Sequence, residues 1–396
     1  MNKAVIAAAL LCAAQARAGE LKFPRIEPRR EKADYSFLQA RLNAGSFSFD
    51  PVSRNSFQMD FRNCDLRGYD LSKNRQLSYA SFNTGTKFPE KLPKGYSPAK
   101  VMELGRNPGL GVRRLHARGI TGKGVGVGIV DQALLPGHVE YADRLRFYEE
   151  IHCLDDKASM HGGAVASLAV GRSLGVAPGA DLYFIGQTNG ETGKDGKFDY
   201  DLGYIAKSID RLLEVNRALP ADRKIRVISI SLAMVEKWKG YGLAAAAIKR
   251  AAAEGVFVLT VGDRAYPLDG LGREPLADPD DRDSYTGCLM FCSNKGGSGP
   301  GELQVPMDSR SLADPNGDDS YYFARVGGQS WAVPWAAGLY ALGCQVYPAL
   351  TPDIFWREAL ASADAVRVKE GPGGYTLRKV ANPARLIARL QALYGK

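Results

Sequence analysis

The sequence predicts an α/β fold, with a mainly parallel sheet and helices on both of its faces. Three apolar runs are suited to buried strands, at residues 124–131, 224–233 and 255–263. Helical patterns lie between or beside them, at residues 161–170, 202–216 and 241–254. Strands that alternate with helices in this way form parallel sheets, and functional groups gather at the carboxyl ends of such strands.

The start of the chain has the features of a secretory signal peptide. Residues 1–18 begin with Lys3, continue through an apolar run and end in Ala16-Arg17-Ala18, a small-x-small cleavage pattern. This predicts export to the periplasm or the extracellular space. No later apolar run reaches the ~20 residues of a membrane-spanning helix, so we expect no transmembrane segment.

Composition and charge indicate a soluble globular protein. The 396 residues are 45% hydrophobic and 24% charged, which suits one large domain or two modest ones. Removing residues 1–18 removes Lys3 and Arg17, so the formal net charge falls from +9 by two to +7. Acidic residues are interspersed with the basic ones, which argues against a nucleic-acid partner.

Five cysteines follow the predicted cleavage site. Export permits disulfides, but an odd count leaves at least one thiol unpaired within the chain. Cys288 and Cys292 are spaced for a small disulfide loop or for half of a metal site, and the sequence leaves both open. The five are Cys64, Cys153, Cys288, Cys292 and Cys344.

Residues 19–95 are polar and rich in turns, with one helix expected at residues 33–43. Four apolar residues in this segment lie five or six positions apart, which is similar to a few turns of a pentapeptide-repeat solenoid: Leu66, Leu71, Leu77 and Phe82. So few turns are too little for an independent fold. We expect a packed N-terminal extension, or a pro-segment that the protein removes by self-cleavage.

One serine stands out in the stretch GGQSWAVPWAAG, residues 327–338. A glycine pair, then Ser330, then an alanine-rich segment with Pro334 predicts a loop followed by the start of a helix. Free N–H groups at a helix start stabilise negative charge, which suits a nucleophile. The same place suits an ordinary N-cap serine, so this stretch alone does not decide.

Two further residues favour the nucleophile. Asp131 ends the first apolar run, and an ionisable side chain there needs a partner. His161 begins a helix whose glycines and alanines allow close packing against the sheet, near Asp131. An aspartate that orients an imidazole, an imidazole that takes a proton and a serine that attacks form the catalytic set of serine hydrolases.

Four segments resemble the motif blocks of subtilisin-like serine peptidases, the subtilase family. They are GKGVGVGIVDQALLPGH, HGGAVASLAVGRSLGVAPGA, VISISLA and GGQSWAVPWAAG, in the family's order and at compatible separations. The chain order Asp, His, Ser is also that of the subtilisin type.

The resemblance implies a subtilisin-like peptidase domain over residues 96–396 and a triad of Asp131, His161 and Ser330. It also implies that Ser231, Leu232 and Ala233 form the strand edge that pairs with an extended peptide, a mode of binding that tolerates many sequences. The expected activity is endopeptidase hydrolysis through an acyl-enzyme intermediate. It acts on protein or peptide substrates, in a monomer, with no required cofactor.

The sequence departs from the family pattern at three places. Glycine and alanine follow His161-Gly162 where the family usually has threonine and histidine, and Gln329 and Trp331 flank Ser330 where it usually has threonine and methionine. The third departure affects the chemistry, because Asp263 stands where the family usually has an asparagine that helps to hold the oxyanion.

A carboxylate at that position would repel the developing negative charge. Loss of one oxyanion donor costs about 10² to 10³ in turnover. Asp263 could be protonated by burial and donate, the Ser330 backbone N–H could act with another donor, or Asp263 could simply be a turn residue.

Three weaker signals remain. The glycines of residues 122–128 precede or lie within a strand, unlike a dinucleotide-binding loop, so we expect no nucleotide site. Acidic loops at residues 276–283 and 312–319 suit a structural calcium ion or ordinary solvated turns. The segment PMDSRS, residues 306–311, precedes Ser330 without an identifiable partner.

Two alternatives to the endopeptidase stay open. Asp263 favours a weakly active or inactive relative that only binds peptides through the 231–233 edge. A serine esterase or amidase with small substrates would use the same triad but would have no need of that edge.

Overall fold

The centre of the molecule is a six-stranded parallel sheet. The computed structural model describes residues 21–29, 31–43, 59–292, 301–369 and 373–394; the predicted signal peptide lies outside them. The strand order is β1-β5-β6-β4-β9-β10, and every ladder is parallel. The bounds are β1 Arg25–Ile26, β4 Gly126–Asp131, β5 Leu145–Glu150, β6 Asp181–Gly186, β9 Ile225–Ala233 and β10 Phe257–Val261.

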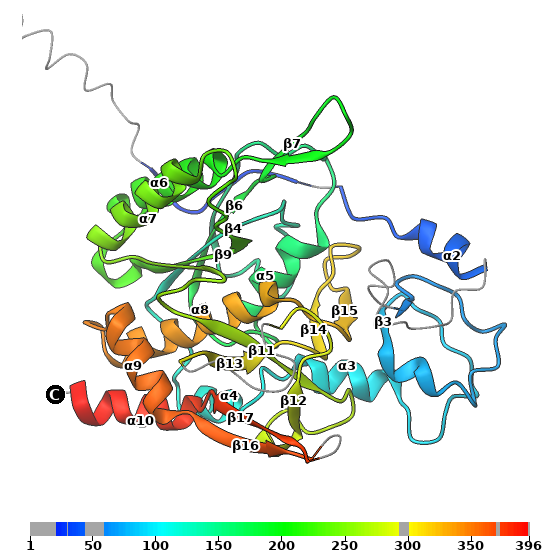
Figure 1. Ribbon diagram of the computed structural model, residues 1–396. Coiled ribbons are helices and arrows are strands. Elements are labelled where there is room, and N and C mark those ends of the chain that lie inside the picture. The colour runs from blue at the N-terminus through cyan, green and yellow to red at the C-terminus, as the bar shows by residue number, and fades with distance from the viewer. Residues whose placement is uncertain (1–20, 30, 44–58, 293–300, 370–372, 395–396) are drawn as a thin grey trace, which may run out of the picture.

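Helices cover both faces of this sheet (Figure 1). Side chains alternate between the faces of a strand, so β4 sends Val127 and Ile129 to one side and Val130 to the other. Val127 and Ile129 join the core formed with α5 (Met160–Val170) and α8 (Gln329–Val346), whereas Val130 joins the core formed with α6 (Gly203–Ala218) and α7 (Tyr241–Ala253). The predicted α/β fold is confirmed, and the three predicted strands and three predicted helices all form.

Two smaller sheets and a hairpin surround the central sheet. One sheet has the order β12-β11-β13-β17-β16 and another β14-β15-β3-β2, while β7 pairs with β8. The bounds are β2 Met59–Asp60, β3 Ala80–Asn83, β7 Gly190–Thr192, β8 Phe198–Tyr200, β11 Leu268–Arg273, β12 Tyr285–Gly287, β13 Leu303–Pro306, β14 Arg310–Ala313, β15 Tyr321–Ala324, β16 Asp364–Val368 and β17 Tyr375–Val380. The other helices are α2 Ser36–Asn43, α3 Pro98–Arg106, α4 Val112–His116, α9 Pro352–Ser362 and α10 Pro383–Tyr394.

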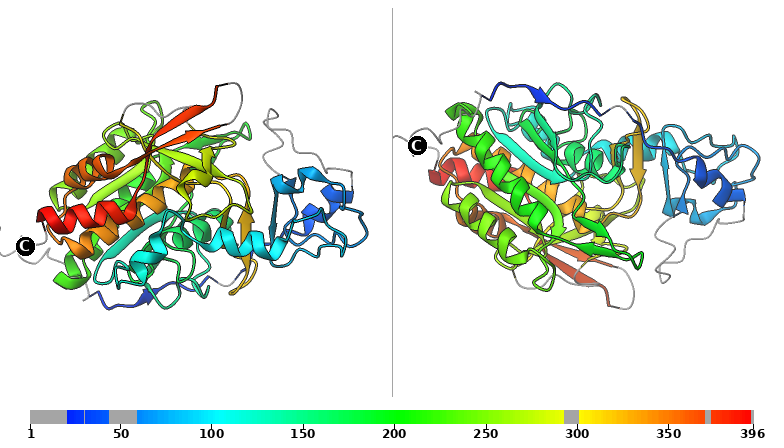
Figure 2. Two further views of the ribbon diagram at one scale, coloured as in Figure 1. Left: turned by 90° about the horizontal axis from the view of Figure 1, so that it is seen from below. Right: turned by 90° about the horizontal axis from the view of Figure 1, so that it is seen from above.

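The segment before residue 96 contributes to two of these sheets. β1 lies at the edge of the central sheet, and β3 pairs with β15, so that Tyr322 lies opposite Asn83. Residues 59–97 form a lobe at one end of the molecule (Figure 2). The four evenly spaced side chains, Leu66, Leu71, Leu77 and Phe82, are all buried in one cluster of that lobe, which also contains Phe323 and Val326. Removal of residues 19–95 by self-cleavage stays a prediction.

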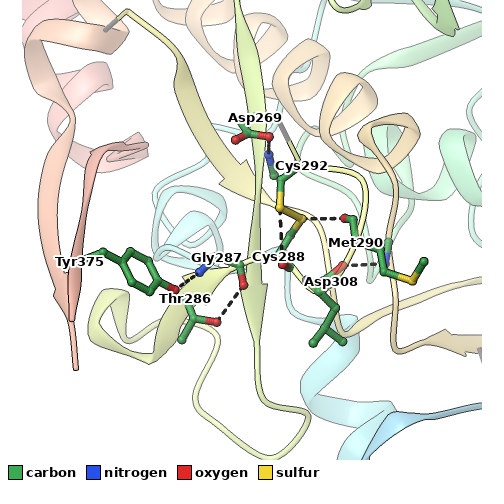
Figure 3. Close-up of a disulfide and its surroundings, with 11 residues drawn as sticks. Asp269, Thr286, Gly287, Cys288, Met290, Cys292, Asp308 and Tyr375 are labelled. Atoms are coloured by element: carbon green, nitrogen blue, oxygen red, sulfur yellow. Dashed lines mark hydrogen bonds between the residues drawn. A yellow bond between two sulfur atoms is a disulfide. The ribbon is translucent and has the colours of Figure 1, made fainter. Parts of the chain in front are cut away.

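Cys288 and Cys292 form a disulfide, which decides between the two interpretations of this pair. It closes a small loop after β12 (Figure 3). Cys64, Cys153 and Cys344 are free. In the described part of the chain, no three His, Cys, Asp or Glu side chains gather as a set of metal ligands. Structural calcium therefore stays a prediction, and the described residues indicate no place where the ion would bind.

The acidic loops expected at residues 276–283 and 312–319 use their carboxylates within the protein. Asp314 is fully buried and accepts hydrogen bonds from the Tyr35 hydroxyl at 2.9 Å and the Asn83 amide at 2.7 Å. Asp280 accepts from the Asn107 amide at 3.0 Å and from the Gly111 backbone at 2.9 Å. These bonds join the acidic loops to the chain before and after residue 96.

Candidate active site

Asp131 and His161 lie together at the carboxyl end of the central sheet. Asp131 ends β4 and is 6% exposed, and its Oδ1 lies 2.6 Å from Nδ1 of His161, the second residue of α5. Ser159 caps this helix and accepts the backbone N–H of His161 at 3.1 Å. Gly162 allows the close approach, because a Cβ there would lie 2.2 Å from the carbonyl oxygen of Gln132.

The environment of His161 has opposing effects on its pKa. Burial lowers the pKa, whereas the charge of Asp131 and the hydrogen bond to it raise the pKa, and the net result is a pKa above the ordinary value of 6.5. The backbone N–H of Gln132 donates to the same Asp131 oxygen at 2.8 Å. The carboxylate therefore holds Nδ1 of the ring and leaves Nε2 for a reacting group.

Ser330 is the second residue of α8. The helix is capped by Gly328, which has no side chain to accept N–H groups, so the interpretation of Ser330 as the N-cap is wrong. The backbone N–H groups of the first turn have no acceptor four residues earlier in the helix, and that of Ser330 is one of them. This arrangement leaves an N–H donor beside the hydroxyl, at the positive end of a long helix.

Pro334 lies inside the same helix, four residues after Ser330. A proline has no N–H, so the carbonyl of Ser330 lacks its usual helical donor. The hydroxyl of Ser231, near the end of β9, donates to this carbonyl at 3.0 Å instead. The sheet thus supplies the bond that the helix cannot make.

The hydroxyl of Ser330 donates to the carbonyl of Ser231 at 3.3 Å. Among the described residues there is no hydrogen bond between Ser330 and His161. The two are linked through Trp331, whose ring centroid lies 5.2 Å from that of His161. Trp331 is 6% exposed, so this ring contact between the serine helix and the histidine is buried.

A cleft of about 540 Å³ opens beside this group. Asp131 and His161 line it together with Ser231 and Leu232. Residues 153–155 and two aromatic residues of β8, Phe198 and Tyr200, line it as well. Cys153 also lines the cleft, but burial raises the pKa of its thiol to about 12. The thiol is therefore protonated at neutral pH and is a poor nucleophile.

Ser231, Leu232 and Ala233 form the end of β9. β9 is an interior strand, but its pairing with β4 ends at Ile230, and its pairing with β10 passes from Ile230 directly to Ala233. Ser231 and Leu232 therefore lie outside both ladders and are half-buried. Their backbone can pair with an extended chain laid along the cleft.

Asp263 follows β10 and acts as a turn residue. Its Oδ1 accepts the backbone N–H groups of Ala265 at 2.8 Å and Tyr266 at 3.3 Å. An aspartate oxygen that accepts the N–H groups two and three residues later is typical of a turn. The geometry favours the turn interpretation over a protonated oxyanion donor.

Residues 122–287 match the family model described as the subtilase family. This segment of the chain is therefore similar to the subtilase family. The match includes Asp131, His161, Ser231–Ala233 and Asp263, and it ends before Ser330.

Among solved structures, the chain is similar to the prenylagaramide maturation protease PagA, with 16% sequence identity and a TM-score of 0.49. That similarity covers 71% of this chain and 99% of the other. No curated protein sequence matches the chain. The family match over residues 122–287 supports a serine peptidase. Within the described residues, no helix is long and apolar enough to cross a bilayer.

Three further residues shape the candidate site, and sequence reasoning assigned a role to none of them. Asp308, in the segment PMDSRS, is buried and accepts the N–H groups of Gly327 at 2.7 Å and Leu289 at 2.8 Å, so this segment bonds to the turn before Ser330. Ser159 caps the histidine helix, and Arg29 reaches the cleft wall from the N-terminal segment. Ser159 carried a local sequence signal, a hydroxyl two residues before His161, whereas Arg29 carried none.

Proposed function

We propose that the protein is an exported serine endopeptidase in which Ser330 attacks a peptide carbonyl. His161 takes the hydroxyl proton on Nε2 and then gives it to the leaving amine, and Asp131 orients the ring. Attack forms a bond from Ser330 Oγ to the carbonyl carbon, and expulsion of the amine leaves an acyl-enzyme that water hydrolyses. The 2.6 Å contact between Asp131 and His161 at the end of the sheet carries the proposal.

Productive attack requires one rotation. The Ser330 hydroxyl must turn from the Ser231 carbonyl toward His161 Nε2. Catalytic hydrogen bonds of this kind are commonly loose before substrate binds. A substrate chain paired with Ser231 and Leu232 would lie beside that carbonyl, which supports a coupling between peptide binding and release of the hydroxyl.

The backbone N–H of Ser330 is the donor best placed for the oxyanion, because it lies at the start of α8 and has no helical acceptor. Asp263 adds no donor in its turn role. We therefore expect a peptidase slower than one with a complete pair of donors, by a factor on the order of 10² to 10³.

The test is cleavage of a mixture of peptides about ten residues long by the purified mature protein, with products identified by mass spectrometry. The proposal predicts new internal cuts that are absent with Ser330→Ala and with His161→Ala. Cleavage that persists in Ser330→Ala would exclude Ser330 as the nucleophile. Turnover of small esters without any peptide cut would favour the esterase.

A second candidate, a peptide-binding relative with little or no turnover, is favoured by one observation. The carboxylate of Asp263 accepts N–H groups where an oxyanion donor is wanted. Measurable peptide affinity without cleavage, unchanged in Ser330→Ala, would support this candidate.

A further inference from the structure

Residues 21–29 form a strap along the edge of the central sheet, coloured dark blue in Figure 1. Within this N-terminal strap, β1 pairs in parallel with β5, so that Arg25 lies opposite Phe147. The Phe23 ring packs edge-on against Phe147 and Tyr183, with centroids 6.4 and 6.2 Å away. The strap is therefore an integral strand of the fold, with an apolar anchor.

The strap ends in a partly buried ion pair. The Arg29 side chain is 8% exposed, and two of its guanidinium nitrogens bind the two carboxylate oxygens of Glu150, the last residue of β5. The Tyr148 hydroxyl donates to the same carboxylate at 2.6 Å. A bidentate ion pair of this kind depends on the planar guanidinium group, which lysine lacks.

The third nitrogen of Arg29 holds the wall of the cleft. Nη1 donates to the carbonyls of Asp155 at 2.6 Å and Lys157 at 3.0 Å. Glu31 continues this attachment, because its carbonyl accepts the N–H of Ala158 at 2.9 Å. Two bonds tie residues 153–158, which we call the pocket loop, to the strap, and the third ties it to Glu31, two residues beyond.

The pocket loop lies between the strap and the catalytic histidine. Five of its residues line the cleft, and the next residue, Ser159, caps the helix that begins with Met160 and His161. The loop has no helix of its own, and its other ties are few, such as the Leu154 N–H to the Thr188 hydroxyl at 3.3 Å. Its position in the cleft therefore depends on the bonds from Arg29 and Glu31.

We propose that Arg29 is a positioning residue for the substrate cleft, and that the N-terminal strap stays in the working peptidase. The strap belongs to the segment that the sequence alone left open as a removable pro-segment. Its removal would leave the Glu150 carboxylate without its buried cation, which is costly, and would release the pocket loop. The proposal deepens the peptidase function above and rests on it for its kinetic test.

The kinetic test compares Arg29→Ala and Arg29→Lys with Arg25→Ala. Arg25 is a matched control on the same strap: its side chain is 50% exposed, and its partner Glu149 keeps Arg211 at 2.6 Å. We expect Arg29→Ala to raise KM for an extended peptide about tenfold, with kcat and labelling of Ser330 by a small fluorophosphonate changed by less than about threefold. Arg29→Lys should raise KM by less than Arg29→Ala does, but KM should stay above that of the parent. Arg25→Ala should have the KM of the parent. An unchanged KM in Arg29→Ala, or an equal rise in Arg25→Ala, would overturn the proposal.

Amide hydrogen exchange gives a readout that needs no activity. Exchange of residues 153–158 should be faster in Arg29→Ala, or in Arg29→Lys if the alanine variant does not fold, while strands β4 and β9 stay protected. Unchanged exchange in the pocket loop would overturn the proposal even if the protein proved to be no peptidase. The intact mass of fluorophosphonate-labelled parent enzyme should include residues 21–29; a fully active, labelled species that lacks them would also overturn it.

Discussion

The hydroxyl of Ser231 donates to the carbonyl of Ser330 at 3.0 Å, and the hydroxyl of Ser330 donates to the carbonyl of Ser231 at 3.3 Å. The first bond exists because Pro334 cannot donate to that carbonyl within α8. The second bond engages the hydroxyl of the proposed nucleophile, Ser330. This reciprocal pair joins the proposed substrate-binding edge to the proposed nucleophile.

Ser231→Ala removes the donor to the Ser330 carbonyl. We expect the variant to lose about 1 kcal/mol of unfolding free energy, since a half-buried acceptor is left without a protein partner. Labelling of Ser330 by a fluorophosphonate should also slow, because the first turn of α8 is less fixed. Thermal unfolding and labelling rates measure both effects. Ser231→Thr keeps the hydroxyl and should behave like the parent; equal losses in both variants would show that packing, not the hydrogen bond, matters.

The pKa of His161 predicts the acid side of the pH profile. Nε2 must be unprotonated to accept the serine proton, and the interaction with Asp131 outweighs burial and raises the pKa above 6.5. We therefore expect kcat/KM to fall as the pH drops through a value above 6.5. Asp131→Asn should move this limb to lower pH and reduce kcat by about 10⁴. If the acidic limb of the kcat/KM profile lies at the same pH in Asp131→Asn, a group other than His161 controls it.

The same pKa has a consequence for stability. A histidine whose folded pKa is raised contributes stability that is fully present below its unfolded pKa, near 6.5, and is lost as the pH rises through the folded pKa. The unfolding free energy of the parent relative to His161→Gln should therefore be larger at pH 5.5 than at pH 8.5. Urea denaturation at the two pH values tests this; no difference between them would contradict the raised pKa.

Asp263→Asn should increase turnover. The asparagine carbonyl can keep the turn by accepting the Ala265 N–H, now at 2.8 Å, and its amide adds a donor where the carboxylate has none. The gain in kcat has an upper bound of about 10² to 10³, the value of one oxyanion donor. Asp263→Ala is the control, since it removes the charge without adding a donor. Equal rates in the two variants would show that the added amide does not reach the oxyanion.

Asp308 should make the region before Ser330 less stable as the pH rises through about 6. Burial raises the pKa of this carboxyl to about 6, although it accepts the N–H groups of Leu289 and Gly327. A raised acid pKa stabilises the fold below the unfolded pKa, near 3.8, and this contribution is lost as the pH rises through about 6.

Asp308→Asn carries no proton to lose. Its stability relative to the parent should therefore improve from pH 4 to pH 7, by an amount on the order of 3 kcal/mol. Chemical denaturation at both pH values measures the change. A constant difference between the two proteins would mean that Asp308 does not titrate in this range.

The sequence alone could predict three strands of the central sheet, β4, β9 and β10, and the Asp131–His161 pair. The strands are continuous apolar runs with buried residues on both faces, and Gly162 marks the close contact between α5 and the end of β4. These signals are local, so they can be recognised in the sequence without knowledge of the fold. The position of His161 two residues after a capping hydroxyl is local as well.

Other features depend on partners far along the chain or on loop geometry. Arg29 and Glu150 are 121 residues apart, and nothing in either segment marks the pair. The cap at Gly328 instead of Ser330 is set by the turn before α8. Asp263 could not be assigned because an aspartate after a strand has the same local sequence in a turn as in a catalytic site.

Labelling of the purified mature protein with a fluorophosphonate, followed by peptide mapping, tests the central claim most directly. If Ser330 is the activated nucleophile, the label should lie on the peptide that contains residues 327–338, and it should be lost in Ser330→Ala and strongly reduced in His161→Ala. A folded parent protein that takes no label, or a label that persists in Ser330→Ala, would contradict the account.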